Sequence, residues 1–176
     1  SSRRRHTRYI SVTGVQTCAL PILTSMFFIC IAQDVITDTK VKSLNGKEIS
    51  FSNITNIKDT PVVVSFWATW CIPCVAELEN INDEMSEWQS KTPFKFIGIA
   101  TDDTRTSQRV KSFVKGKGWQ FDVYTDANQE LKRALSVTDV PHVLIIKNNK
   151  IVYRHTGYIA GEEDNLFKEI QKISKP

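Results

Sequence analysis

The chain has 176 residues, with 23 lysines or arginines against 19 aspartates or glutamates, and a formal net charge of +4 at pH 7. Four arginines and no acid lie in residues 1–22, so residues 33–176 hold 19 residues of each sign and carry no net charge. Because no basic run remains, the composition excludes a nucleic-acid-binding surface, and the length suits one well-buried domain.

Residues 1–22 have no sustained helical or strand pattern, and SSRRRHTRYISVTGVQTCALPI resembles translated sequencing-adapter read-through. We interpret them as a non-native leader; the alternative is the basic start of a targeting peptide. Residues 23–32 are uncharged and end in Cys30-Ile31-Ala32, which indicates the remnant of a secretory signal peptide cleaved after Ala32. An uncleaved anchor and a lipid on Cys30 are alternatives, although about ten residues are too few to span a bilayer as a helix. Residues 33–176 are then the folded domain, in a periplasmic or otherwise extracytoplasmic location.

The hydrophobic pattern of this domain alternates between strands and helices. The valine-rich run 61–67 is typical of a central strand covered on both faces, and apolar residues recur at helical spacing from 72 to about 88. The predicted elements are strands over 40–43 and 48–51, a strand over 61–67, a helix over 72–88, a strand over 95–100, a helix from about 105 to 118, a strand over 121–124, a helix over 128–135, strands over 143–146 and 150–155, and a last helix after 157. This order predicts an α/β fold whose mixed sheet has a parallel core and an antiparallel closing hairpin.

Turn residues support these boundaries. Asn45-Gly46 predicts a type I′ turn in the first hairpin, and Asn148-Asn149 tolerates the left-handed backbone of a tight hairpin turn. The three acids at 162–164 lie where the positive end of a helix dipole favours negative charge, which predicts the start of the last helix there.

The chemistry-bearing motif is WATWCIPC, which follows the strand over 61–67 directly. It delivers Cys71 to the first turn of a helix, where free N–H groups and the helix dipole can lower a thiol pKa from about 8.5 toward about 7. Cys74 lies one turn further on, within reach of Cys71. We therefore predict Cys71 as the nucleophile and Cys74 as the resolving thiol. A structural zinc site is the alternative, but residues 33–176 offer only two histidines and carboxylates as further ligands.

This motif, with Val140-Pro141 before an antiparallel hairpin, resembles the thioredoxin superfamily and, more narrowly, the extracytoplasmic thiol–disulfide reductases of the TlpA/ResA class. The similarity covers roughly Val35 to Ile173. It implies a thioredoxin-like fold, a central mixed β-sheet flanked by helices, with an N-terminal β-hairpin. It also implies a helix–strand insertion over about 105–124 between the second core strand and the helix that precedes the proline.

The resemblance also assigns roles outside the cysteine pair. Pro141 matches the cis-proline of the superfamily, and Val140 is expected to present its backbone to a bound client. In the TlpA/ResA class an acid at the position of Glu77 is buried near the dithiol, where a raised pKa would let it accept the proton of Cys74. A solvated helix glutamate is the alternative. Ser65 departs from the acid or amide that relatives carry there, which places the proton transfer on Glu77 or water.

The remaining site predictions concern the surroundings of the sulfurs. Trp70 is expected beside them, limiting the access of solvent, and Ile72 and Pro73 are expected to contact the client. Ile72 and Pro73 place no imidazole or basic group beside the sulfurs, which favours a couple nearer the reducing end of the known range. His142 either belongs to the core or surface or tunes the redox pair, and both possibilities stay open.

These features predict a protein-disulfide reductase that works through a mixed disulfide, with haem-site cysteines of cytochrome c as possible targets. It needs no cofactor and no metal beyond its cysteine pair. Its expected partners are disulfide-bearing client proteins and a membrane thiol-electron donor, and we expect a monomer. Three alternatives remain: a disulfide oxidase or isomerase, a copper-handling module using Cys71, Cys74 and His142, and a peroxide reductase.

Overall fold

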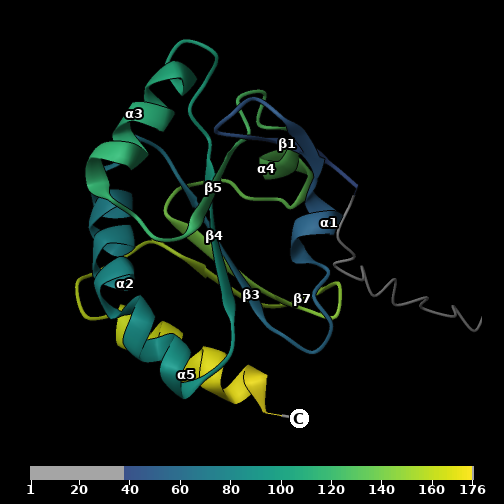
Figure 1. The fold of residues 1–176 in the computed structure, drawn as a ribbon, viewed down its shortest axis with the longest axis vertical. Coiled ribbons are helices and arrows are strands. Elements are labelled where there is room, and N and C mark those ends of the chain that lie inside the picture. The colour runs from purple at the N-terminus through teal and green to yellow at the C-terminus, as the bar shows by residue number, and fades with distance from the viewer. Residues whose placement is uncertain (1–37, 176) are drawn as a thin grey trace, which may run out of the picture. The chain divides into compact units, whose positions relative to one another are not determined.

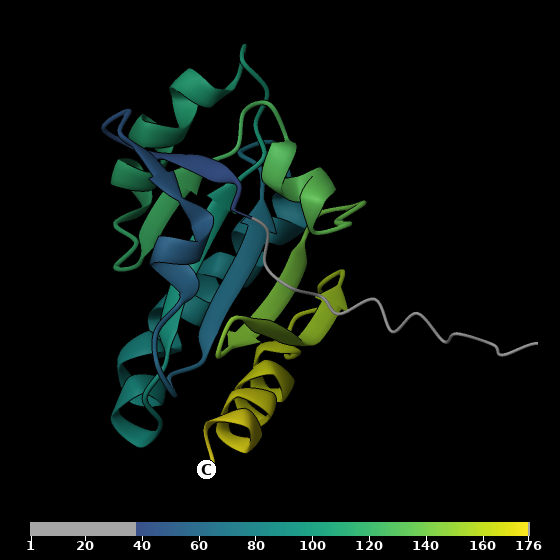
Figure 2. The same cartoon turned by 90° about the vertical axis from the view of Figure 1, so that its right-hand side faces the viewer.

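The computed structural model describes residues 38–175 (Figures 1 and 2). The predicted leader over 1–22 and the predicted signal remnant over 23–32, with Cys18 and Cys30, lie outside these described residues. Among residues 38–175, no helix is both long and apolar enough to cross a membrane.

The helices and strands follow the predicted order closely. They are β1 (Lys40–Ser43), β2 (Glu48–Ser50), α1 (Phe51–Thr55), β3 (Val62–Trp67), α2 (Ile72–Lys91), β4 (Lys95–Ala100), α3 (Ser107–Lys117), β5 (Asp122–Thr125), α4 (Glu130–Ala134), β6 (His142–Lys147), β7 (Lys150–Thr156) and α5 (Glu163–Ser174). The predicted helix–strand insertion corresponds to α3 and β5.

In the described part of the chain the strands form a single seven-stranded sheet in the order β2-β1-β5-β4-β3-β6-β7. β3, β4 and β5 run parallel, whereas β6 and β7 pair antiparallel, so the predicted mixed sheet is confirmed. β3 lies at the centre, with Val64 opposite Ile97 of β4 and Leu144 of β6. β5 pairs with β1, so the insertion joins the first hairpin to the core sheet.

Each face of the sheet buries its own set of side chains, because successive residues of a strand point to opposite faces. On the face that α2, α3 and α5 cover, Val63 and Trp67 of β3 pack with Leu78 of α2 (Figure 1). On the face that α1 and α4 cover, Val64 and Phe66 pack with other buried residues. Ser65 lies between Val63 and Trp67 in the alternation and therefore shares the face that α2 covers.

Two local predictions were wrong. The strand predicted over 48–51 ends at Ser50, because Phe51 begins the short helix α1 and buries its ring completely. The first hairpin does not have a type I′ turn: Gly46 has a positive φ of 83°, but Asn45 does not. In the second hairpin both Asn148 and Asn149 have positive φ, as predicted.

Candidate active site: a disulfide at the start of helix α2

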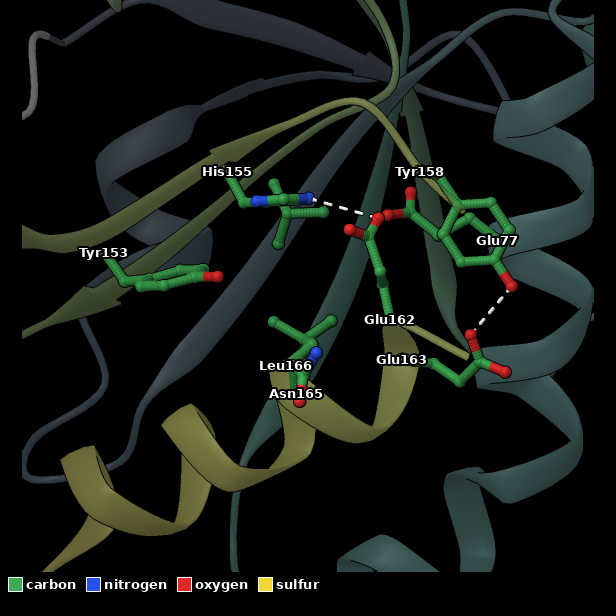
Figure 3. Close-up of a pocket in the computed structure, with 9 residues that line it drawn as sticks. Glu77, Tyr153, His155, Tyr158, Glu162, Glu163, Asn165 and Leu166 are labelled. Carbon is green, nitrogen blue, oxygen red and sulfur yellow. Dashed lines mark hydrogen bonds and ion pairs between the residues drawn. The ribbon is translucent and has the colours of Figure 1, made fainter. Parts of the chain in front are cut away.

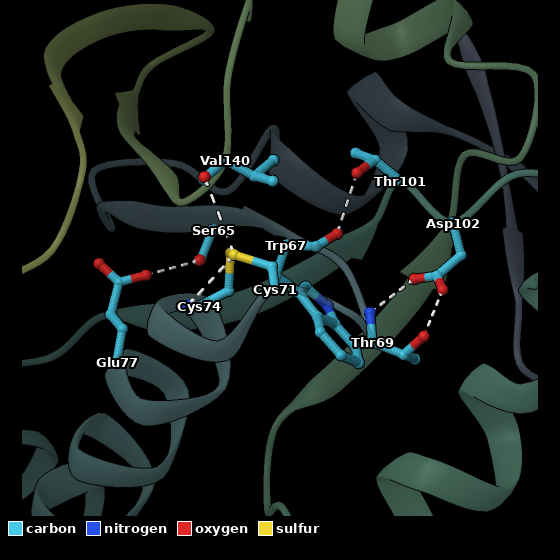
Figure 4. The surroundings of a disulfide bond; sticks show 9 residues. All are labelled: Ser65, Trp67, Thr69, Cys71, Cys74, Glu77, Thr101, Asp102 and Val140. Atoms are coloured by element: carbon cyan, nitrogen blue, oxygen red, sulfur yellow. Dashed lines mark hydrogen bonds between the residues drawn. A yellow bond between two sulfur atoms is a disulfide. The ribbon is translucent and has the colours of Figure 1, made fainter.

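The two cysteines form a disulfide at the junction of β3 and α2 (Figure 4). Cys71 is the N-cap residue of α2, and its sulfur accepts a hydrogen bond from the backbone N–H of Cys74 at 3.3 Å. Cys71 is 5% exposed and Cys74 is completely buried. The predicted positions of both cysteines at the helix start are confirmed, and Cys71 is the sulfur that lies nearer to solvent.

The helix start favours a negative sulfur at Cys71. The first N–H groups of a helix have no partner within the helix, and the helix dipole places partial positive charge there. Pro73, in the first turn of α2, lacks an N–H group where a helix does not need one. When the disulfide opens, the N–H of Cys74 and the dipole therefore stabilise the thiolate form of Cys71 over the thiol.

The Val140-Pro141 peptide bond is cis, which confirms the predicted cis geometry, while the catalytic role of Pro141 stays a prediction. The Val140 carbonyl oxygen lies 3.8 Å from the sulfur of Cys71, so the segment before Pro141 borders the disulfide (Figure 4). The folded chain thus brings Val140 and Pro141 to the cysteines from almost seventy residues away. The contact of Val140 with a client stays a prediction.

Glu77 is a buried acid, 3% exposed, and its carboxylate accepts a hydrogen bond from the Ser65 hydroxyl at 3.2 Å (Figure 4). Burial raises the pKa of Glu77 to about 8, against a smaller opposite effect of the Ser65 hydrogen bond; the charges of Glu162 and Glu163 raise it further. The alternative of a solvated glutamate is therefore wrong. Ser65, which sequence reasoning treated as a missing proton acceptor, is the hydrogen-bond partner of Glu77.

The predicted client contacts Trp70, Ile72 and Pro73 lie within two residues of Cys71 in the chain. Trp70 is 65% exposed and Ile72 is 83% exposed, so neither side chain is used by the core. Large apolar side chains that a fold leaves in solvent beside a reactive group are available to a partner protein. Their roles as client contacts, and the role of Trp70 in limiting solvent access, stay predictions.

His142 belongs to the interior. It is 6% exposed, its Nδ1 atom lies 2.8 Å from the Thr156 hydroxyl, and burial lowers its pKa. In the alternation of β6 it shares a face with Leu144, on the side of the sheet opposite α2. Residues 38–175 contain no group of three His, Cys, Asp or Glu side chains placed to hold a metal ion. The copper-handling alternative stays open.

Asp102 is a site residue that the sequence analysis missed. It is completely buried at the end of β4, and its carboxylate accepts hydrogen bonds from the backbone N–H and the hydroxyl of Thr69 (Figure 4). Thr69 lies two residues before Cys71. Asp103, the next residue, has a different role: it accepts a hydrogen bond from the backbone N–H of Thr106, the N-cap residue of α3. Because β3 and β4 are parallel neighbours, their carboxyl ends lie at the same edge of the sheet. This pairing is the signal that could have placed Asp102 beside Thr69.

We expect Asp102→Ala to loosen the segment before Cys71, because it leaves the N–H of Thr69 without its acceptor. Losing hydrogen bonds to a charged group should lower the free energy of unfolding by about 2 kcal/mol, measured by urea denaturation. Asp102→Asn retains an acceptor for the Thr69 N–H and should recover most of the loss. Equal stability of the alanine variant and the wild type would show that Asp102 does not hold this segment.

A buried disulfide at a helix N-terminus, beside a cis-proline on a mixed α/β sheet, defines a thioredoxin-like thiol–disulfide oxidoreductase. The chain belongs to the AhpC/TSA family, whose profile matches residues 32–155. It is 31% identical over 135 residues to the thiol-disulfide oxidoreductase ResA of Bacillus cereus, covering 76% of this chain and 73% of that protein.

Solved structures agree on the fold. An uncharacterized thioredoxin-like protein from Porphyromonas gingivalis has 35% sequence identity and a TM-score of 0.69, over 79% of this chain and 91% of that one. A putative thiol:disulfide interchange protein DsbE from Chlorobium tepidum has 21% identity and the same TM-score, over 81% and 97%. The protein is thus an enzyme of the thiol–disulfide oxidoreductase class.

Proposed function

We propose that this oxidoreductase works in the reducing direction and transfers two electrons from its dithiol to a disulfide in a client protein. The thiolate of Cys71 attacks one client sulfur, and the other client sulfur leaves and takes up a proton. The thiol of Cys74 then loses its proton to Glu77, and its sulfur attacks the sulfur of Cys71. This attack breaks the bond between Cys71 and the client, and the second client sulfur leaves and takes up a proton from water. The client leaves as a dithiol, and Cys71–Cys74 is again a disulfide.

One observation carries the proposal: the sulfur of Cys71 lies between the N–H of Cys74 and the carbonyl of Val140. The buried acid Glu77 lies on α2, one turn beyond Cys74. The helix start favours the attacking thiolate, and the buried carboxyl group can take or return one proton for each disulfide closed or opened. The disulfide couple itself holds the electrons, so the proposed reaction uses no cofactor.

The partners follow from this direction of transfer. Every turnover leaves the enzyme oxidised, so a thiol donor must open the Cys71–Cys74 bond again. We propose an extracytoplasmic location, consistent with the signal remnant predicted over 23–32, and a membrane thiol carrier as the donor. Haem-site cysteines of cytochrome c are one class of client that such an enzyme would keep reduced.

The direction is tested by the equilibrium reduction potential of the purified protein against glutathione, together with its rate of insulin reduction. Ile72 and Pro73 place no imidazole or basic group beside the sulfurs, so we expect a potential well below roughly −150 mV and catalysed insulin reduction. A potential above that value, with oxidation of a reduced client faster than reduction, would instead establish a disulfide oxidase or isomerase.

A further inference from the structure

A cavity of about 250 Å³ lies beside Glu77, on the side of the sheet that α2 and α5 cover (Figure 3). Its polar walls include Glu77 of α2, His155 of β7, Tyr158 of the following loop, and the acids Glu162 and Glu163 at the start of α5. Three carboxyl groups, one from α2 and two neighbours at the start of α5, therefore share one small space.

The two acids at the start of α5 are held in position by hydrogen-bond donors. Glu163 accepts hydrogen bonds from the Tyr158 hydroxyl at 2.8 Å and from the backbone N–H of Gly161 at 2.9 Å. Glu162 accepts the backbone N–H of Ile159 at 2.8 Å, and it lies 3.5 Å from Nε2 of His155. Burial alone would raise the pKa of Glu163, but the hydrogen bonds that it accepts favour its charged form and lower that pKa.

Glu77 differs from these two acids in burial and in its donor. It is 3% exposed, and the hydrogen bond it accepts comes from the neutral hydroxyl of Ser65. When several carboxyl groups share a site, the one whose anion is least stabilised keeps a proton. Here that group is Glu77, which is also the acid closest along the chain to the redox pair.

We propose that Glu162 and Glu163 act through Glu77 as positioning residues: their negative charges add to the effect of burial and help to keep a proton on Glu77 while the disulfide is closed. This inference rests on the proposed function, in which Glu77 exchanges a proton with Cys74. When a donor thiolate attacks the sulfur of Cys71, the Cys71–Cys74 bond breaks and Cys74 leaves as a thiolate. Glu77 then gives its proton to that sulfur and becomes a carboxylate. This transfer leaves the summed charge of Glu77 and Cys74 unchanged.

The other titratable groups around Glu77 do not compete for this role. On α2 the thiols are joined in the disulfide. From β7, Tyr153 has a pKa raised by burial, and burial together with the Glu163 hydrogen bond raises the pKa of Tyr158 to about 12, so both phenols stay neutral. The hydrogen bonds to Glu163 outweigh its burial and lower its pKa. The Nε2 atom of His155, from β7, lies 3.5 Å from a carboxyl oxygen of Glu162.

The test measures the pKa of Glu77 directly, by carbon NMR titration of the oxidised protein with labelled glutamate side chains. The variants are Glu162→Gln, Glu163→Gln and the two combined. We expect each single change to move the pKa of Glu77 downward from about 8, and the combination to move it furthest. At pH 8 the opening of the disulfide by dithiothreitol should slow, by about fivefold if the pKa falls to about 7.

Asp164→Asn is the matched control, because Asp164 lies on the same turn of α5, is exposed and does not line the cavity. It removes the same charge from the helix start and should leave the pKa of Glu77 unchanged. An unchanged pKa of Glu77 in both single variants would overturn the inference. A shift as large in Asp164→Asn as in Glu162→Gln would do the same, because it would indicate a general effect of charge.

The titration needs no client, so its outcome does not depend on the direction of electron transfer. If the pKa moves as expected but Glu77→Gln opens its disulfide as fast as the wild type, the proton transfer in the proposed function fails while the electrostatic link stands. If Glu77→Gln opens its disulfide slowly, but the pKa of Glu77 is the same in Glu162→Gln and Glu163→Gln as in the wild type, the proposed function stands and this inference fails.

Discussion

The Cys74→Ser variant is expected to accumulate covalent adducts with its clients, whereas Cys71→Ser accumulates none. Cys71 lies at the helix start, where its thiolate is favoured, and at 5% exposure it is the sulfur nearer to solvent; Cys74 is completely buried. A client disulfide can therefore reach Cys71 first. Without the thiol of Cys74, the bond between Cys71 and the client has no neighbouring nucleophile to break it.

The lifetime of the adduct should increase by at least about 10³-fold. Attack by Cys74 is intramolecular, and well-oriented groups in one molecule react as if present at concentrations far above any solution thiol. Non-reducing electrophoresis of each variant incubated with oxidised insulin, followed by mass spectrometry of the adduct, measures this. The double variant Cys71→Ser/Cys74→Ser gives the background. If Cys71→Ser and Cys74→Ser trapped equal amounts, the assignment of the two roles would be wrong.

The sequence predicted the parts of the molecule that local patterns determine. The run 61–67 is buried throughout, and a strand covered on both faces needs such a run. Two cysteines three residues apart after that strand meet at the helix start because a helix turn spans that distance. Pro141 was placed by resemblance to a family, not by any local pattern, and the structure has the cis bond expected there.

The missed features depend on contacts between distant segments. Asp102 accepts a hydrogen bond from Thr69 because β4 lies beside β3 with its carboxyl end at the same edge of the sheet. No local pattern in the sequence specifies that these two strands are neighbours. The hydrogen bond between Ser65 and Glu77 requires the register of α2 on the sheet. Glu162 and Glu163 were predicted as the start of a helix, which is correct, but their contact with the cavity beside Glu77 depends on where α5 packs.

The wrong turn in the first hairpin has a local cause. Asn-Gly favours a type I′ turn when both residues adopt a positive φ, but here the loop is longer than two residues. The N–H of Gly46 donates to the carbonyl of Ser43 at 2.8 Å, and the N–H of Ser43 donates to the carbonyl of Lys47 at 2.9 Å. Only the glycine then needs the left-handed conformation, and the dipeptide alone does not fix the loop length.

Glu77→Gln is expected to stabilise the oxidised protein above neutral pH. Burial raises the pKa of Glu77 to about 8 in the folded protein, whereas its ordinary value is 4.5. Below pH 4.5 both the folded and the unfolded protein hold this proton, and Glu77 costs no stability. As the pH rises from 4.5 to 8, the unfolded chain loses the proton more readily, so the free energy of unfolding falls by up to about 1.4 kcal/mol per pH unit.

The full loss is reached above pH 8 and is about 5 kcal/mol. The amide in Glu77→Gln does not ionise and can still accept the Ser65 hydrogen bond, so this loss should be missing. Urea denaturation of both proteins between pH 4 and pH 9, with the disulfide closed, gives the difference in the free energy of unfolding. Glu84→Gln, an exposed change on the same helix, should follow the wild type at every pH. If the free energies of unfolding of Glu77→Gln and the wild type ran parallel between pH 4 and pH 9, the prediction would be wrong. Folding would then leave the pKa of Glu77 at its ordinary value, because only a group with a shifted pKa makes the two stabilities diverge with pH.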